Sequence, residues 1–385
     1  MIKLLKKIKM KNYKILLILI FILLINNLNN IIFLKIIKFY TFNRIRKYLN
    51  KCLLVFNSNG KIILNYQNPK ISVIIPVYNS ENSIILSINS IRNQKLKDFE
   101  IILINDNSKD NSKKVIENLQ KEDSKIFVIN NNKNMGTLYS RSIGVLASKG
   151  EYIFALDNDD MFADENLFYR LYQEAKKYNY DIIGFKSIIG YNYYSNISEM
   201  NEDPFINKKA DMVVYQPELR IFSLINNDCH IWGKCIKRNV YKKAINDLGK
   251  ERYSIYLCYS EDDVMVFILF KIAKSFKFTN KYGIFHIKSN KTASSYLSRN
   301  HLLFSKIFFL DVVFDFSENK FTEKEFVVSY AINIIMIFLS KIVLNNENKE
   351  YLKLVLRKII SSDFISKNKK ETLINNFKNY SLYIQ

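Results

Sequence analysis

Short apolar segments alternate with helical patterns from residue 71 to residue 186, and no other feature constrains the fold as strongly. The apolar segments are predicted to be strands: Ile71–Val77, Phe99–Ile104, Lys125–Ile129, Tyr152–Leu156 and Asp181–Lys186. The segments between them are predicted to be helices: Ser83–Asn93, Asp110–Gln120, Thr137–Ala147 and Asn166–Lys177. Strands that alternate with helices form a parallel, doubly wound sheet joined by right-handed crossovers. The sequence therefore predicts an α/β fold with a Rossmann-like, mostly parallel sheet flanked by helices.

Three carboxylates follow the fourth predicted strand. Asp157, Asp159 and Asp160 stand directly after its apolar residues. Ligands of open α/β sheets lie outside the carboxyl ends of the strands, and like charges this close raise one another's pKa unless a cation holds them. A divalent cation that bridges carboxylates and substrate phosphates would do so. The competing interpretation is an acidic loop with an Asp that caps the helix starting near Asp164, because a D-x-D pattern is short and common.

The three earlier strand ends carry polar residues suited to a nucleotide. The first offers Tyr78, whose ring can lie flat on a base, beside a helix start whose amide groups face a ligand. The second offers the carboxylate of Asp106. The third offers Gly136, which lets the backbone approach closely, followed by Arg141, which can pair with phosphate or ribose. Each loop alone is equally typical of an ordinary βα turn, but together with the acidic cluster they favour a nucleotide site.

The positive charge of the chain is concentrated at its start. Of a net charge of +22, fourteen charges come from residues 1–80, which contain no Asp or Glu, and this leaves +8 for the rest. This distribution indicates a basic segment near a membrane and not the basic, aromatic-rich face of a nucleic-acid-binding protein. The four Cys form no C-x-x-C pair and only three His are present, so the sequence argues against a zinc site.

An uncharged stretch from Ile15 to Leu34 has about the length needed to cross a bilayer. It is predicted to be an uncleaved signal-anchor, a single transmembrane helix in an ER/Golgi-type or plasma membrane, although four Asn weaken the pattern. A signal peptide and an amphipathic helix on an anionic membrane surface are the alternatives. Six Lys/Arg precede the stretch and six follow closely, so the orientation is undecided.

The chain is predicted to have three parts: a basic N-terminus with anchor and linker (1–69), a catalytic domain (70–295) and a helical C-terminal extension (296–385). Residues 187–217 are predicted to be a loop or small hairpin. Ser260 and Asp263 resemble a capping box that starts an apolar helix ending at Ala273. Thr322 and Glu325 are predicted to cap a further apolar helix, Phe326–Leu339. This helix is expected to be a buried or membrane-leaning element, with a membrane span as the alternative.

An ordered set of motifs resembles the family 2 glycosyltransferases, which have the GT-A fold. The first strand, ending Pro76-Val-Tyr-Asn79, looks like their opening strand, and Asn105 to Asp110 is similar to their D-D-G-S-x-D motif. Asn134-Met-Gly136 with Arg141-Ser-x-Gly144 resembles their N-x-G-x-x-x-A-R-N-x-G. Leu156 to Asp160 matches their D-x-D motif, Trp232-Gly-Lys234 a W-x-K element, and Ser260-Glu-Asp262 their E-D motif. The resemblance covers roughly residues 70 to 295.

The resemblance implies roles by position. Tyr78 and Asp106 would contact the base, while Arg141 and Asp157 would contact ribose or phosphate. Asp159 and Asp160 would hold Mn²⁺ or Mg²⁺ on the diphosphate. Asp262 would be the general base, with Glu261 as the neighbouring candidate. The remaining implied residues are Pro76, Asn79, Glu81, Asn134, Gly136 and Asn158 for the nucleotide sugar, and Trp232 and Lys234 for the acceptor side. The sequence departs from the family at Asn105, where Asp is commoner, and at Asn107, where Gly is commoner.

The implied reaction is inverting transfer of a sugar, with a UDP-sugar preferred as donor, to a hydroxyl of a glycan, lipid or protein acceptor. Processive members usually carry Q-x-x-R-W, but Cys229-His-Ile231 precedes the sole Trp, so a non-processive enzyme is favoured. His286 is predicted to follow the last strand of the core, and it is either a group that approaches the metal or a structural histidine. A nucleotidyltransferase would need a Gly-rich phosphate loop after the first strand, and none is present. The alternative from another class is a catalytically silent, glycosyltransferase-like binding or scaffold protein at a membrane.

Overall fold

The computed structural model describes residues 54–56, 62–64, 69–190, 201–202, 212–215, 230–257, 259–287, 299–317, 346–363 and 365–378. The chain divides into two units, Met1–Gln67 and Asn68–Gln385. In the first unit, β1 (Leu54–Phe56) pairs antiparallel with β2 (Ile62–Leu64). The predicted anchor Ile15–Leu34 and the predicted helix Phe326–Leu339 lie outside the described residues. Within the described ranges, no helix combines the length and the apolar character that a membrane crossing requires.

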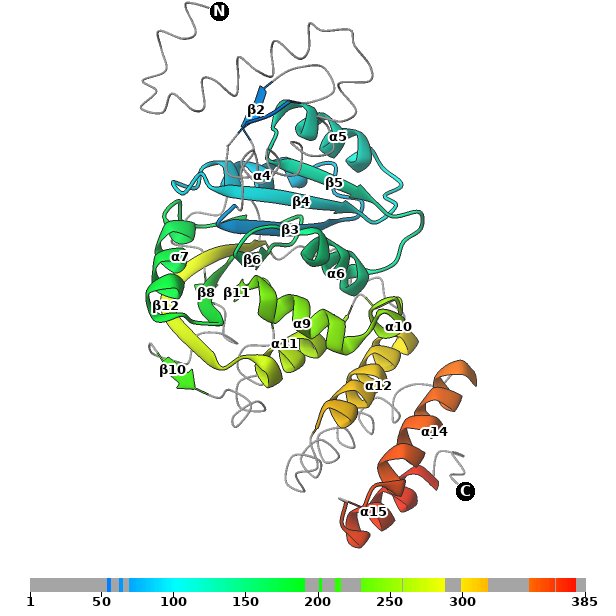
Figure 1. Ribbon diagram of the computed structural model, residues 1–385. Helices are drawn as coiled ribbons and strands as arrows, with labels where there is room; N and C mark the ends of the chain where they lie inside the picture. Colours follow the sequence, from blue (N-terminus) through cyan, green and yellow to red (C-terminus); the bar gives the residue numbers. More distant parts are fainter. Residues whose placement is uncertain are drawn as a thin grey trace, which may run out of the picture. The chain divides into compact units, whose positions relative to one another are not determined.

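The parallel half of the sheet is the part that the alternation predicts. Its strands stand in the order β6 (Tyr152–Ala155), β3 (Ile71–Val77), β4 (Phe99–Asn105) and β5 (Ile126–Asn130), all parallel (Figure 1). Every residue of β4 is buried, and all of β3 except Pro76, because helices cover both faces. The predicted α/β fold with a mostly parallel sheet is confirmed.

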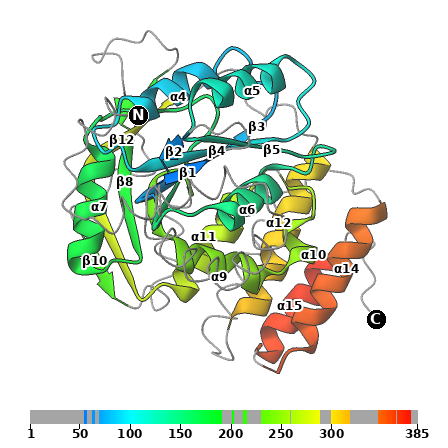
Figure 2. The same cartoon turned by 45° about the horizontal axis from the view of Figure 1, so that its top comes forward.

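Helices cover both faces of this half of the sheet. Figure 2 shows α4 (Ile84–Arg92) and α5 (Ser112–Glu122) on one face and α6 (Thr137–Ala147) on the other. The apolar side of each helix is buried, as at Ile84, Ile88 and Ile91 of α4. The second half adds α7 (Leu167–Tyr178), α9 (Arg238–Leu248), α10 (Lys250–Tyr253) and α11 (Glu261–Ile272). Among these, α9 and α11 lie on the same face as α6 (Figure 2).

The other half of the sheet is mixed. After β6 it continues with β11 (Lys234–Lys237), β8 (Ile182–Gly190), β12 (Ser275–Ile287) and β10 (Met212–Tyr215). Strand β11 runs antiparallel to both of its neighbours, whereas β8 and β12 are parallel to each other. Two short strands, β7 (Met161–Phe162) and β9 (Asn201–Glu202), pair antiparallel with β12 and β8. The reversed strand β11 therefore joins two parallel sets.

Three sequence expectations need correction. The strand predicted to end at Lys186 continues to Gly190, and β9, in the stretch predicted to be a loop or small hairpin, pairs antiparallel with it. His286 lies inside β12 and does not follow it; the polar residues 279–282 interrupt the apolar pattern at a register shift in this strand. Ser260 forms no capping hydrogen bond. Its φ of 57° is left-handed, whereas a capping side chain requires an extended backbone at that residue.

The described part of the C-terminal extension is helical, with α12 (Arg299–Phe316), α14 (Asn346–Ser361) and α15 (Lys367–Lys378). Helix α12 packs against α11 and α14. Asp311 of α12 accepts from Lys358 Nζ at 2.8 Å and from the Tyr351 hydroxyl at 3.2 Å. Arg252 of α10 pairs with Asp315 of α12. The Arg252–Asp315 pair and the packing of α12 on α11 attach the extension to the helices that precede β12.

Candidate active site

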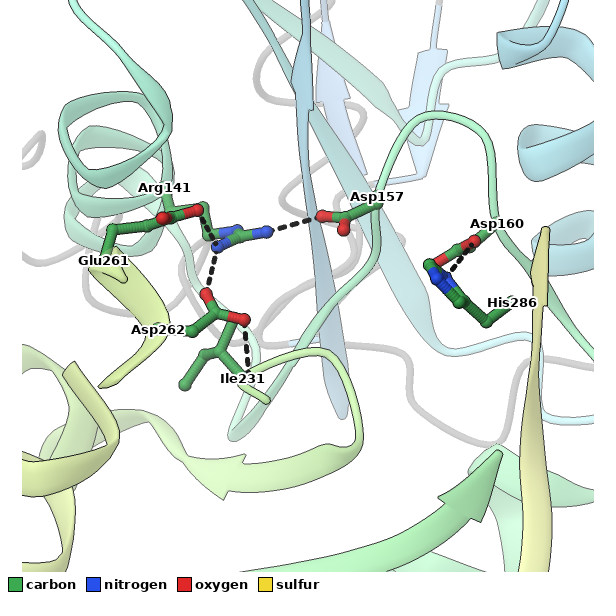
Figure 3. Close-up of polar contacts among 7 residues, drawn as sticks. All are labelled: Arg141, Asp157, Asp160, Ile231, Glu261, Asp262 and His286. Atoms are coloured by element: carbon green, nitrogen blue, oxygen red, sulfur yellow. Dashed lines mark hydrogen bonds and ion pairs between the residues drawn. The ribbon is translucent and has the colours of Figure 1, made fainter. Parts of the chain in front are cut away.

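Three segments that are distant in the sequence meet at the carboxyl end of β6. Arg141 comes from α6, Asp157 from the loop after β6, and Glu261 and Asp262 from the first turn of α11 (Figure 3). The position follows from the topology, because parallel strands present their carboxyl ends at one edge of the sheet. The structure therefore brings together four of the predicted site residues.

Arg141 is the centre of this group. Its Nη2 lies 2.5 Å from Asp157 Oδ1, and its Nη1 donates to Asp262 Oδ1 and lies 3.4 Å from Glu261 Oε1. The residue is only 5% exposed. A buried charge is costly unless it is paired and hydrogen-bonded, so the three carboxylates are what allows this guanidinium to be buried.

The electrostatics of the group are set by burial and by these pairs. Burial disfavours the charged guanidinium, but the charges of Asp262, Asp157 and Glu261 outweigh it and raise the pKa of Arg141. Burial raises the pKa of Glu261 to about 8; Asp262 adds to the rise and Arg141 opposes it. Burial also raises the pKa of Asp262, again against Arg141. A carboxylate with a raised pKa is a stronger base near neutral pH.

Both carboxylate oxygens of Asp262 have partners in the structure. Oδ1 accepts from Arg141, and Oδ2 accepts from the backbone N–H of Ile231 at 3.1 Å. The Ile231 amide is a contact that sequence reasoning missed, because a backbone group has no signature in the sequence. These two contacts hold the predicted base in one orientation beside Asp157.

The acidic loop is divided between two surroundings. Asp160 is fully buried; its Oδ1 lies 2.9 Å from His286 Nδ1 and accepts from the Ile287 N–H at 3.1 Å. Burial lowers the basicity of His286, but the hydrogen bond and charge of Asp160 raise its pKa to about 9. In Figure 3 Asp157 lies between this pair and Arg141. The sequence left two interpretations of His286 open, a group that approaches the metal and a structural histidine. In the structure it is hydrogen-bonded to Asp160.

Asp159 has no ion pair with any described cation, and burial, with Asp160 and Asp157, raises its pKa to about 7. Its carboxylate oxygens are the ligand type that Mg²⁺ and Mn²⁺ prefer. Across the described residues, no three His, Cys, Asp or Glu side chains are grouped to hold a metal ion. The residues fit a cation that takes one or two carboxylates from the protein and its other ligands from substrate phosphates.

Asp106, which the resemblance places at the base, accepts hydrogen bonds from the loop before α6 in this structure. Its Oδ1 accepts from Met135 N–H and Asn131 Nδ2, both at 2.8 Å, and its Oδ2 accepts from Gly136 N–H at 2.8 Å. Asp106 is 4% exposed. The side chain therefore shapes the loop before α6, and Asn131, which sequence reasoning missed, belongs to the same network.

Two features of the backbone restrict position 136 to glycine. Its φ is +86°, and a Cβ there would stand 2.7 Å from the carbonyl oxygen of Leu257. Asn134 Oδ1 also accepts from the Gly136 N–H at 3.1 Å. The loop that precedes Arg141 is thus packed directly against the segment that leads to α11, so the donor-side and base-side segments are in contact.

The loop after β3 is tied to the loop after β4. Asn79 Oδ1 accepts from Lys109 N–H at 2.8 Å, and Glu81 Oε2 accepts from Asn111 N–H at 2.7 Å. Tyr78 is 42% exposed, which leaves its ring available for stacking. Pro76 lies within β3. These side chains therefore form one surface at the ends of adjacent parallel strands.

The remaining predicted residues are more enclosed. The carbonyl of Asn158 accepts from the Ser87 hydroxyl at 3.0 Å. Lys234 is fully buried in β11 and donates to the carbonyl of His230. Trp232 is 4% exposed. Neither Trp232 nor Lys234 presents an open side chain for an acceptor in this structure.

Part of the chain is similar to known glycosyltransferases. The family model "Glycosyl transferase family 2" matches residues 72–226. The uncharacterized glycosyltransferase EpsJ of Bacillus subtilis is 28% identical over 223 residues, which are 58% of this chain and 62% of the relative. The cholesterol galactosyltransferase of Borreliella burgdorferi is 31% identical over 241 residues, which are 60% of this chain and 64% of the relative. The chain thus spans less than two thirds of either relative.

Solved structures share the fold. The crystal structure of S. aureus TarS 1-349 in complex with UDP-GlcNAc has a TM-score of 0.58 and 16% identity, covering 82% of this chain and 93% of that chain. A complex of the same TarS fragment with UDP has a TM-score of 0.57. At this level of identity the likeness concerns the fold alone.

Proposed function

This chain contains a family 2 glycosyltransferase domain with the GT-A fold, and we propose that it transfers a sugar from a UDP-sugar to a hydroxyl group with inversion. The observation that carries the proposal is the link through Arg141 between Asp157, on the donor side, and Asp262, the candidate base. This link holds a carboxylate base beside the strand ends where a nucleotide would lie. The acceptor class, a glycan, lipid or protein, belongs to the same proposal.

The roles of the residues follow from their positions. The ring of Tyr78, which is half-exposed, would stack on the base, and the loop held by Asp106 would face the ribose and phosphates. Asp262 would take the proton of the acceptor hydroxyl as it attacks the anomeric carbon. Attack from the face opposite to the leaving diphosphate inverts the stereocentre. Glu261 shares the burial and the Arg141 contact, and it is the second candidate for the base.

A divalent cation is part of the proposal. Asp159 would hold it, with Asp160 as the neighbouring candidate, and the remaining ligands would come from the donor diphosphate. When bound, Mn²⁺ or Mg²⁺ offsets the negative charge that develops on the departing diphosphate. Support comes from Asp159, which forms no ion pair with a described residue and whose pKa is raised to about 7 by burial and the neighbouring carboxylates, against the charge of His286.

The N-terminal membrane anchor and a membrane location remain proposals from the sequence pattern. If these proposals are right, the full chain sediments with membranes and is extracted from them only by detergent. A chain lacking residues 1–34 that still sediments with membranes would contradict the anchor.

The test of the proposed function is nucleotide binding and turnover by the full chain. We expect UDP with Mn²⁺ or Mg²⁺ to raise the melting temperature, because a ligand that binds only the folded state stabilises it by mass action. EDTA and Asp159→Asn should remove the increase. Asp262→Asn should retain it and lose transfer from UDP-sugars, with inversion read by NMR of the product. If no nucleotide stabilises the folded chain, the silent binding or scaffold protein becomes the better interpretation.

A further inference from the structure

The indole ring of Trp232 stacks with two imidazole rings. The His230 ring stacks on it with a centroid distance of 4.6 Å and an interplanar angle of 19°, and the His286 ring stacks at 5.4 Å and 9°. Trp232 is 4% exposed. A sugar that stacks on an aromatic residue needs a free ring face, so this Trp is not available as a sugar platform in the structure.

The stack ends at two different parts of the site. At one end, His286 holds the fully buried Asp160 through Nδ1 at 2.9 Å. At the other end, the segment that carries His230 and Trp232 also carries Ile231, whose N–H binds Asp262 Oδ2 at 3.1 Å. The stack therefore lies between the acidic loop and the carboxylate of the candidate base.

The contacts close into a ring around the site. Arg141 joins Asp262 to Asp157, and the Asp160 N–H donates to the carbonyl of Asp157 at 3.2 Å. From Asp160 the path returns through His286 and Trp232 to the segment that holds Asp262. In such a ring, the separation between the base and the acidic loop depends on the thickness and planarity of the stacked rings.

We propose that Trp232 is a positioning residue, which sets the distance between Asp262 and the Asp160 end of the acidic loop through its stack with His230 and His286. The inference rests on the proposed function, since the distance in question is the one between the proposed base and the proposed donor site. A misplacement of about 1 Å in a reacting pair can cost roughly 100-fold in rate.

The first experiment is spectroscopic and does not need turnover. Trp232 is the only Trp in the chain, so the intrinsic fluorescence of the full chain reports this ring. We expect His286→Ala and His230→Ala to change its emission. Asp160→Asn should also change it, because His286 loses its carboxylate partner. Asp159→Asn removes no hydrogen bond to His286 and should change the emission much less. Equal emission in wild type, Asp160→Asn and His286→Ala would overturn the proposal.

The second experiment separates positioning from acceptor binding. Trp232→Phe keeps a planar ring and should retain most of kcat, whereas Trp232→Leu should lower kcat by roughly 10- to 100-fold with the acceptor KM within twofold of wild type. Phe168→Leu is the matched control, since Phe168 is a fully buried aromatic residue that packs on Phe154 and Phe162. It should lose stability and keep kcat.

The outcomes are distinguishable. A large rise in acceptor KM in both Trp232 variants, with kcat unchanged, would mean that the ring binds the acceptor and would overturn the proposal. A kcat loss of the same size in Phe168→Leu would reduce the effect to general destabilisation and would also overturn it. If the wild-type chain turns over no nucleotide sugar, the proposed function fails, and the emission change in Asp160→Asn still decides whether the stack responds to the acidic loop.

Discussion

Arg141 and Asp262 form a buried ion pair that joins the middle of α6 to the first turn of α11. The same guanidinium reaches Asp157 at 2.5 Å, so one side chain connects the strand end that carries the acidic loop to the helix that carries the candidate base. Because both oxygens of Asp262 are engaged, its basicity and its orientation depend on Arg141.

We predict that Arg141→Gln destabilises the fold by about 3–5 kcal/mol, because removing one partner of a buried pair leaves the other charges uncompensated. Transfer activity should fall by roughly 100-fold, since the base loses its orientation. Urea unfolding and steady-state kinetics measure the two effects. The control is Arg170→Gln, which breaks a partly exposed pair with Asp164 and should cost about 0–1 kcal/mol. Equal losses in the two variants would contradict the central role of Arg141.

We predict that Glu261 makes the fold less stable as the pH rises from about 4.5 to about 8. Its pKa is about 8 in the folded chain and about 4.3 when unfolded. In that window the folded state binds more protons, so the free energy of unfolding falls with rising pH. Each unit of the pKa difference corresponds to about 1.4 kcal/mol. Urea midpoints at pH 5, 6.5 and 8 should fall less in Glu261→Gln than in wild type. Parallel curves would show that Glu261 does not titrate in this way.

We predict that Gly136→Ala weakens UDP binding, whereas Gly249→Ala does not. The two glycines have nearly the same positive φ, +86° and +84°, and a side chain in that backbone region costs about 1–3 kcal/mol at either position. Only at Gly136 would the new Cβ also meet backbone, the carbonyl oxygen of Leu257 at 2.7 Å. Calorimetric titration with UDP and the melting temperature of each variant measure the difference. The prediction is wrong if both variants bind UDP alike.

We predict that Asp106→Asn lowers affinity for every nucleoside diphosphate by a similar factor, on the order of 10-fold for a loss of about 1.4 kcal/mol. The Asn side chain can accept at only one of the two oxygen positions. Either the Gly136 N–H then keeps only Asn134 Oδ1 as its acceptor, or the Met135 N–H and the side-chain amide of Asn131 lose the oxygen that they share. The loop before α6 then loses its shape. Thermal shifts with UDP, CDP, GDP and ADP test this. A change in nucleotide preference would instead assign Asp106 to direct recognition of the base.

The sequence pattern predicted the first half of the fold closely because the information there is local. The strand Ile71–Val77 and the helix Thr137–Ala147 have the predicted bounds. The departure of Asn107 from the Gly of the family motif also has a local reason: its φ is +58°, and Asn tolerates the left-handed region better than other residues with a side chain. The repeat of apolar residues, every 2 residues in a strand and every 3.6 in a helix, can be seen without knowing what the segment packs against.

The second half was less predictable because its strands depend on pairing. Strand β11 has four residues, Lys234–Lys237, and is stabilised between β6 and β8 in a direction opposite to both. Strand β12 contains a register shift near Thr279, where polar residues hide the pattern. Neither feature has a signature in the sequence, so the placement of His286 within the sheet was missed.

The sequence by itself determined which side chains can do chemistry here: the carboxylates after β6, the Arg of α6 and the acidic start of α11. The tertiary structure decided which of these side chains contact each other. Asp262 and Arg141 are 121 residues apart in the chain, and Asp160 and His286 are 126 apart, so packing alone determines their contacts. Burial makes those contacts strong, because a charge removed from water must find its partner within the protein. That is why Asp106 shapes a loop, Asp160 binds a histidine, and Trp232 stacks with two imidazole rings.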